Sequence, residues 1–197
     1  MAIQLLPNPF CSHEDWMNNA CTTGHMQFHE LSTYYRESAD ALVAHAQANH
    51  PSLDSHIYAI CFLYRHSFEL MLKELIWKSR YLNCGKSDWK MSHVLSDLWQ
   101  TARKSARETL ADDYPLSKHD EAQVTEYFCR IEEHDSNSFS FRYPYDAMKK
   151  PTLTELRNVN IRVLQENSTA ITAFLEKLSS RVQYLFDREG ELRQSTD

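Results

Sequence analysis

The sequence predicts an all-α fold, an up-and-down bundle of about five helices. Three glycines and six prolines in 197 residues are too few for the turns of sandwiches and barrels, or for the phosphate loop of a doubly wound fold. With 42% hydrophobic and 24% charged residues the chain can bury a core, which excludes a disordered protein. We expect an irregular segment over 1–27, a helical bundle domain over 28–188 and a polar tail over 189–197.

Two helices are expected in the first half of the chain, separated by a proline. The first covers about 27–49 and ends there because Pro51 disfavours helical geometry in the residue before it. The second covers about 52–81, and Gly85 suits the left-handed cap that follows a helix. Its apolar residues have three- and four-residue spacing, which predicts the central helix of the bundle. They are Ile57, Ile60, Cys61, Tyr64, Phe68, Met71, Leu72 and Leu75.

Two shorter helices follow. One is expected over about 92–111, with Leu98 and Trp99 in its buried stripe. The other is expected over about 117–134, because Ser117 can cap its N-terminus and Asp120 is favourable near the positive end of a helix dipole.

The last helix is expected over about 152–188. Thr152 and Glu155 have the spacing of a capping box, and Pro151 precedes them. Apolar residues then repeat every seven positions, as in a helix that packs along a bundle or across a homodimer. The repeat consists of Leu164, Ile171, Leu178 and Leu185, with Leu175 and Val182 between them.

An aromatic loop, residues 135–150, separates the last two helices. Pro144 restricts this stretch to an edge strand or a long ordered loop. Arg142 and its aromatic neighbours are candidates to stack a base and bind a phosphate, or to anchor a protein partner. The alternative is a loop folded onto the bundle, with Arg142 paired to a carboxylate such as Glu69 or Asp146. The alternating aromatic residues are Phe139, Phe141, Tyr143 and Tyr145.

A polar stripe accompanies the apolar face of the central helix. Arg65, Glu69 and Lys73 are four residues apart and share one side of that helix. With His66 beside them and His93 at the start of the next helix, they can form a pocket for a phosphate or a partner. The alternative is a buried network that fixes the packing of the helices.

The net charge of −6 argues against a general nucleic-acid coat protein. It conceals a basic middle, because residues 65–107 hold nine basic and four acidic residues whereas residues 1–64 hold one and six. The stretch from Lys78 to Arg107 is therefore a candidate surface for RNA or for an acidic protein partner. The alternative is an ordinary solvated helix face.

The sequence shows neither a secretory signal nor a membrane segment. Its longest apolar run, 57–64, is far below the roughly 20 residues of a membrane helix, and five irregularly spaced cysteines favour free thiols in the cytoplasm. Cys11, His13, Cys21 and His25 are candidate zinc ligands, but their spacing matches no common zinc site. Scattered side chains are the alternative, and we expect no metal or other cofactor.

Two stretches resemble HEPN domains, the "higher eukaryote and prokaryote nucleotide-binding" helical bundles. Residues 64–76 (YRHSFELMLKELI) and 93–99 (HVLSDLW) are similar to the Glu-x3-Lys-x-Leu and His-x-Leu-x-x-Leu patterns of their second and third helices. Residues 135–146 (DSNSFSFRYPYD) are similar to a Ser-Phe-x-Phe-Arg-Tyr-Pro-x-Asp signature of bacterial HEPN-like proteins. The resemblance covers roughly 28–186. It implies a helical bundle, frequent homodimers and roles in toxin–antitoxin, anti-phage and RNA-cleavage systems.

The resemblance also implies where a ribonuclease site would be, and the sequence departs from it. Active HEPN ribonucleases use an Arg and a His four to six residues apart, across a dimer. Here the fifth residue after Arg157 is Arg162, only three residues separate Arg130 from His134, and the Arg65-His66 pair is adjacent. A metal-independent ribonuclease needs a base for the 2′-hydroxyl and a cation for the phosphate, and the base is missing from its place.

We therefore expect a non-catalytic, HEPN-like binding protein of the bacterial immunity or antitoxin type, which acts on a protein partner such as a toxin. The expected binding residues are Arg65, Glu69, Lys73, His93, Phe141, Arg142 and Tyr143. One alternative is a metal-independent ribonuclease toxin with a rearranged site. Its residues would be Arg65, His66, His93 and Arg142. A third hypothesis is a homodimerisation module built on the last helix.

Overall fold

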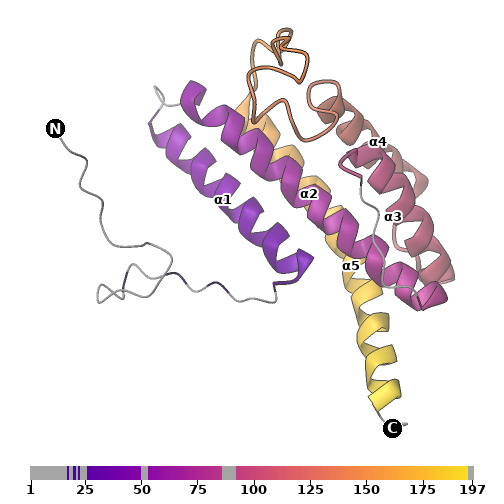
Figure 1. Cartoon of the computed structure of the whole chain (residues 1–197). Coiled ribbons are helices and arrows are strands. Elements are labelled where there is room, and N and C mark those ends of the chain that lie inside the picture. The colour runs from indigo at the N-terminus through magenta and orange to yellow at the C-terminus, as the bar shows by residue number, and fades with distance from the viewer. Residues whose placement is uncertain are drawn as a thin grey trace.

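The structure is a computed structural model that describes residues 17, 20, 22, 26–49, 53–85 and 92–194. Within these ranges the chain forms five α-helices and one short 3-10 turn, and no strand, which confirms the predicted all-α class. Figure 1 shows α1 and α2 side by side, α3 and α4 along one flank of α2, and α5 behind it. The helices are α1 (Phe28–Ala48), α2 (Leu53–Cys84), α3 (Leu95–Leu110), α4 (Lys118–Glu132) and α5 (Ile161–Gln194).

The second helix is central, as its apolar stripe predicts. It contacts α1, α3 and α5, and most of its side chains from Ile60 to Ser79 are buried. Each large apolar side chain that is fully buried contributes about 1.5–3 kcal/mol relative to an exposed one. The largest of them include Phe68, Leu72, Leu75 and Ile76 of α2, Leu98 and Trp99 of α3, Phe128 of α4 and Leu175 of α5.

A few polar contacts fix how the helices lie against one another. Asp40 of α1 accepts hydrogen bonds from the Tyr64 hydroxyl of α2 at 2.5 Å and from the Gln165 amide of α5 at 3.1 Å. Trp99 of α3 donates to the Thr125 hydroxyl of α4 at 2.9 Å. Because these groups are partly buried, each contact specifies the position of a helix as well as stabilising it.

The predicted helix ends are confirmed at several places. Ser117 Oγ accepts the Asp120 amide at 3.2 Å while Asp120 returns a bond to the Ser117 amide, so a capping box opens α4. Gly85 has a φ of +69°, as expected for a left-handed cap. The first helix begins and ends within a residue of its predicted bounds.

The predicted start of the last helix is wrong. Thr152 does not cap a helix, since its hydroxyl donates to the carbonyl oxygen of Tyr143 at 2.6 Å, and Leu153 has a φ of +54°. The helix begins at Ile161, where the Asn160 side chain accepts the Val163 amide at 3.1 Å. It also continues to Gln194, so most of the expected polar tail is helical.

The heptad repeat of α5 packs within the chain. Ile171, Leu175, Leu178 and Val182 are all buried against the other helices, and Leu164 and Leu185 lie half-buried at the ends of the stripe. The stripe therefore completes the core of one copy of the chain. A homodimer through the last helix would need a different face of α5.

Among the described helices none is both long and apolar enough to cross a membrane. The three cysteines in the described part of the chain, Cys61, Cys84 and Cys129, are free thiols, as predicted.

Candidate functional site

The polar stripe of α2 forms a buried charge network. Glu69 accepts a bond from Arg65 Nη1 at 3.2 Å through one carboxylate oxygen. Its other oxygen lies 2.8 Å from Lys73 Nζ and 2.8 Å from His93 Nδ1. The sequence prediction that these four residues lie together is therefore confirmed. The side chain of Arg65 is 0% exposed, whereas the His93 ring is 58% exposed at the edge of the network.

The guanidinium group of Arg65 joins α2 to two other segments. Its Nη2 donates to the carbonyl oxygen of His93 at 2.5 Å, just before α3 begins. Its Nε donates to the carbonyl oxygen of Asp135 at 3.1 Å and lies 3.4 Å from the Asp135 carboxylate. Every nitrogen of this guanidinium group therefore has a partner inside the protein, which a buried cation requires.

Burial and neighbouring charges shift the pKa of two groups in the network, Arg65 and Glu69. Burial lowers the pKa of Arg65, and the charges of Asp135 and Glu69 oppose that effect. Burial alone would raise the pKa of Glu69, but the hydrogen bond and charge of Lys73, together with His93, outweigh it and lower this pKa. The network is an ion cluster that joins α2, the start of α3 and the aromatic loop.

Asp135, which the sequence analysis did not single out, organises the aromatic loop. Its Oδ1 accepts the backbone amides of Phe139 at 2.6 Å and Ser140 at 2.9 Å, and it is buried. Ser138 has a φ of +58°, which closes a tight turn around this carboxylate. The Asp-Ser-Asn composition was the available signal, because such residues favour turns through side-chain to backbone hydrogen bonds.

Within the described residues, Arg142 pairs with neither Glu69 nor Asp146, the carboxylates that one of the two interpretations of the sequence offered it. Within the described residues its Nε donates to the Ser138 carbonyl oxygen at 2.7 Å, and its guanidinium carbon lies 5.5 Å from the ring centre of Phe62 and 5.4 Å from that of Tyr143. The carboxylates named as its partners are occupied elsewhere, Glu69 in the buried network and Asp146 in its own turn. Arg142 is therefore an exposed cation that lies close to two aromatic rings.

An aromatic platform surrounds Arg142, formed by side chains of α1, α2 and the loop. His66 lies between Tyr35, with ring centres 4.6 Å apart, and Phe62, with ring centres 5.5 Å apart. Burial lowers the pKa of His66, so its ring is neutral at neutral pH. Within the loop, Tyr143 stacks on Phe139, with ring centres 4.5 Å apart. The platform consists of Tyr35, Phe62, His66, Phe139 and Tyr143.

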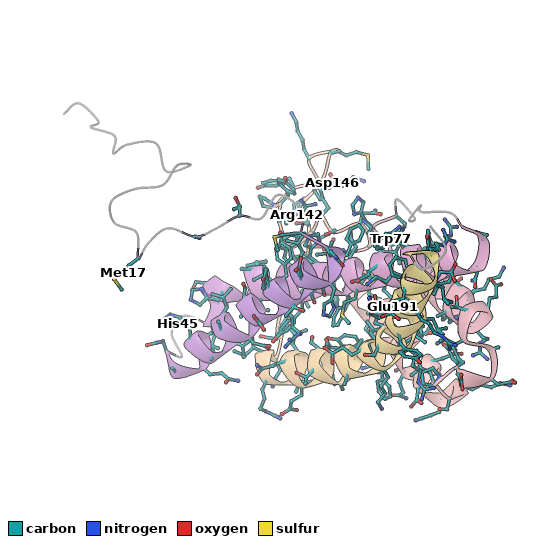
Figure 2. All side chains as sticks on the ribbon, turned by 90° about the horizontal axis from the view of Figure 1, so that it is seen from below. Met17, His45, Trp77, Arg142, Asp146 and Glu191 are labelled. Carbon is teal, nitrogen blue, oxygen red and sulfur yellow. The ribbon has the colours of Figure 1, made fainter. Side chains whose placement is uncertain are left out.

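The outer part of the loop is exposed and basic. Tyr145 is 57% and Met148 72% exposed, and Lys149 and Lys150 are exposed beside them. Figure 2 shows Arg142 and Asp146 on the loop that projects from the bundle. The two carboxylates of the loop, Asp135 and Asp146, accept hydrogen bonds from backbone amides of the loop. The exposed charge of the loop therefore comes from its arginine and lysine side chains.

Phe141 is not among the ring contacts of this platform and instead lines cavities near the start of α5. Together with Leu156 and Val159 it lines two cavities of about 280 and 540 Å³ beside the start of α5. The candidate binding residues thus divide into three groups: the buried network, the platform with Arg142 and Tyr143, and Phe141 among the cavity walls. Cys11, His13, Cys21 and His25 lie outside the described residues.

No family model, curated protein or solved structure matches this chain. The resemblance to HEPN domains therefore stays a prediction.

Proposed function

We propose that this chain is a non-catalytic, HEPN-like binding protein of the immunity or antitoxin type, which engages an acidic protein partner through the aromatic loop. The observation that carries the proposal is the contrast between Arg65 and Arg142. Arg65 is fully buried and fully paired, so it is not placed to touch a phosphate. Arg142 is exposed, and its position is fixed by Ser138, Phe62 and Tyr143.

The chemistry of the loop fits a protein partner. Arginine and tyrosine are the residues most often found at the energetic centre of protein interfaces, and a fixed orientation reduces the entropy lost on binding. The exposed Tyr145 and Met148 add apolar area, and Lys149 and Lys150 favour a partner of negative charge. A cytoplasmic toxin with an acidic, partly apolar surface is the partner that this combination best fits.

One observation favours a second candidate function, a ribonuclease. The His93 ring is bound at Nδ1 by Glu69 at 2.8 Å and exposes its other side to solvent, as a general base would. Among the described residues, the two cations that pair with Glu69 are buried, however, with Arg65 0% and Lys73 9% exposed. Stabilising a phosphodiester would require a cation that reaches the solvent next to His93.

The proposal is tested by co-expressing the chain with the protein encoded by its neighbouring gene and measuring the affinity of the purified complex. Arg142→Ala with Tyr143→Ala should weaken it by about thirtyfold or more, because hot-spot truncation costs roughly 2 kcal/mol or more. Arg162→Ala, an exposed position on α5, is the matched control and should leave the affinity unchanged. A complex that survives the loop variant, or a chain that forms no complex and degrades RNA, would overturn the proposal.

A further inference from the structure

A groove of about 1280 Å³ lies between the C-terminal end of α2, one face of α3 and the first turn of α4. It is remote from the aromatic loop. Arg80 of the groove lies 18 residues beyond Phe62 along α2, roughly 27 Å at the rise of an α-helix. The part of α3 that lines it, from Asp97 to Glu108, covers about three helical turns.

The lining carries most of the basic stretch that the sequence singled out. Lys78 does not contribute, because it is buried and bound to Glu74 and Gln183. Lys104 and Lys118 are exposed and form no ion pair within the described part of the chain. The basic residues of the groove are Arg80, Arg103, Lys104, Arg107 and Lys118, and the acidic ones are Asp97, Glu108 and Glu121.

Two of these arginines are held in place by one buried carboxylate. Glu121 accepts Arg107 Nη2 at 2.5 Å and the Tyr114 hydroxyl at 2.7 Å through one oxygen, and Arg103 lies 3.5 Å from the other. The Arg107 guanidinium group also lies over the Tyr114 ring, with its carbon 4.5 Å from the ring centre. The two side chains remain 39% and 51% exposed, so each guanidinium group has donors turned to the groove.

We propose that this groove binds an acidic helical segment of a second protein, whose carboxylates pair with Arg103, Arg107 and Lys104. Fixed guanidinium groups suit bidentate carboxylate recognition, and a helix of about three turns matches the length of the lining. An RNA strand fits less well. None of the described residues that line the groove is aromatic, and Tyr114, whose ring is covered by Arg107, is outside it, so the lining offers no ring on which a base could stack.

This inference does not depend on the function proposed for the aromatic loop. Its test uses the full chain and a fluorescent, glutamate-rich helical peptide as the probe, with a single-stranded RNA of equal charge in parallel. Lys104→Glu with Lys118→Glu should weaken peptide binding by about tenfold or more, because two attractive charges become repulsive. Both positions are exposed, so circular dichroism should show an unchanged fold.

The matched control reverses two exposed arginines that do not line the groove, Arg130→Glu with Arg162→Glu, and should leave peptide affinity unchanged. The proposal is overturned if the peptide does not bind the wild-type chain, or if the groove variant binds it as tightly as wild type. Tighter binding of the RNA than of the peptide, lost in the same variant, would assign the groove to nucleic acid instead.

Discussion

The Nε of Arg65 donates a hydrogen bond to the main-chain carbonyl oxygen of Asp135, 70 residues further along the chain. A side chain in the middle of the central helix thereby fixes the first residue of the aromatic loop. The Asp135 carboxylate then holds the turn that leads to Arg142. The polar stripe and the exposed loop are separate motifs in the sequence. In the structure, the hydrogen bonds of Arg65 and Asp135 join them.

Removing the buried cation should destabilise the protein strongly. We expect Arg65→Met to lower the free energy of unfolding by about 3–5 kcal/mol, because it keeps the volume of the side chain but removes the cation beside the buried Asp135 carboxylate and one of the partners of Glu69. Urea denaturation of the purified variant measures this loss. Arg162→Met is the control: its ion pair with Glu166 is exposed, so we expect a change below about 1 kcal/mol. Equal, small effects of both substitutions would show that the network is not structural.

Truncating Asp135 should loosen the loop more than the bundle. In Asp135→Ala the amides of Phe139 and Ser140 lose their acceptor, so we expect their hydrogen exchange to accelerate to the rate of unprotected amides. Amides in the middle of α1, such as that of Val43, serve as the internal control. Unchanged protection of the two loop amides would contradict the role given to this carboxylate.

Acid should weaken the fold through His66. Its folded-state pKa is lowered from the ordinary 6.5 by burial, so the unfolded chain binds a proton more readily than the folded one. The free energy of unfolding should therefore fall as the pH drops below about 6.5 toward the lowered value. Denaturation at about pH 7.5 and about pH 5.5 measures this loss. Between these two pH values, the free energy of unfolding should fall less for His66→Phe than for wild type. An equal loss in both proteins would show that His66 does not cause the fall in unfolding free energy. His119→Gln, at an exposed position, is the control substitution.

The heptad stripe of α5 should behave as core. We expect Leu178→Ala to cost about 2–5 kcal/mol, because the side chain is fully buried and its removal leaves a cavity. Tyr184→Ala, at a 65% exposed position on the same helix, should change stability by less than about 0.5 kcal/mol. If Leu178→Ala kept wild-type stability but halved the mass in solution, the stripe would be an interface between two copies.

Apolar periodicity, a proline break and capping residues were sufficient to predict the five helices. The grouping of Arg65, Glu69 and Lys73 depends on four-residue spacing, which local helix geometry translates directly into one face. The buried alternative for this group was also open from the sequence, since a long apolar stripe beside it implies little access to water.

Long-range contacts explain what the sequence did not predict. Thr152 and Glu155 satisfy a capping pattern, but the Thr152 hydroxyl is taken by Tyr143, so the helix starts nine residues later at Asn160-Ile161. The partner of Arg65 is 70 residues away, and no local rule connects two such positions. Arg142 likewise finds its partners in a turn and two rings instead of a carboxylate.

The most direct measurement is the incubation of the purified chain with total RNA, alongside a folded His93→Ala variant. We expect the RNA to stay intact with both proteins, because in the described part of the chain the two cations that pair with Glu69 beside His93 are buried. Cleavage by the wild-type chain that disappears in His93→Ala would contradict the structural role of the network and make the Glu69–His93 pair a catalytic site.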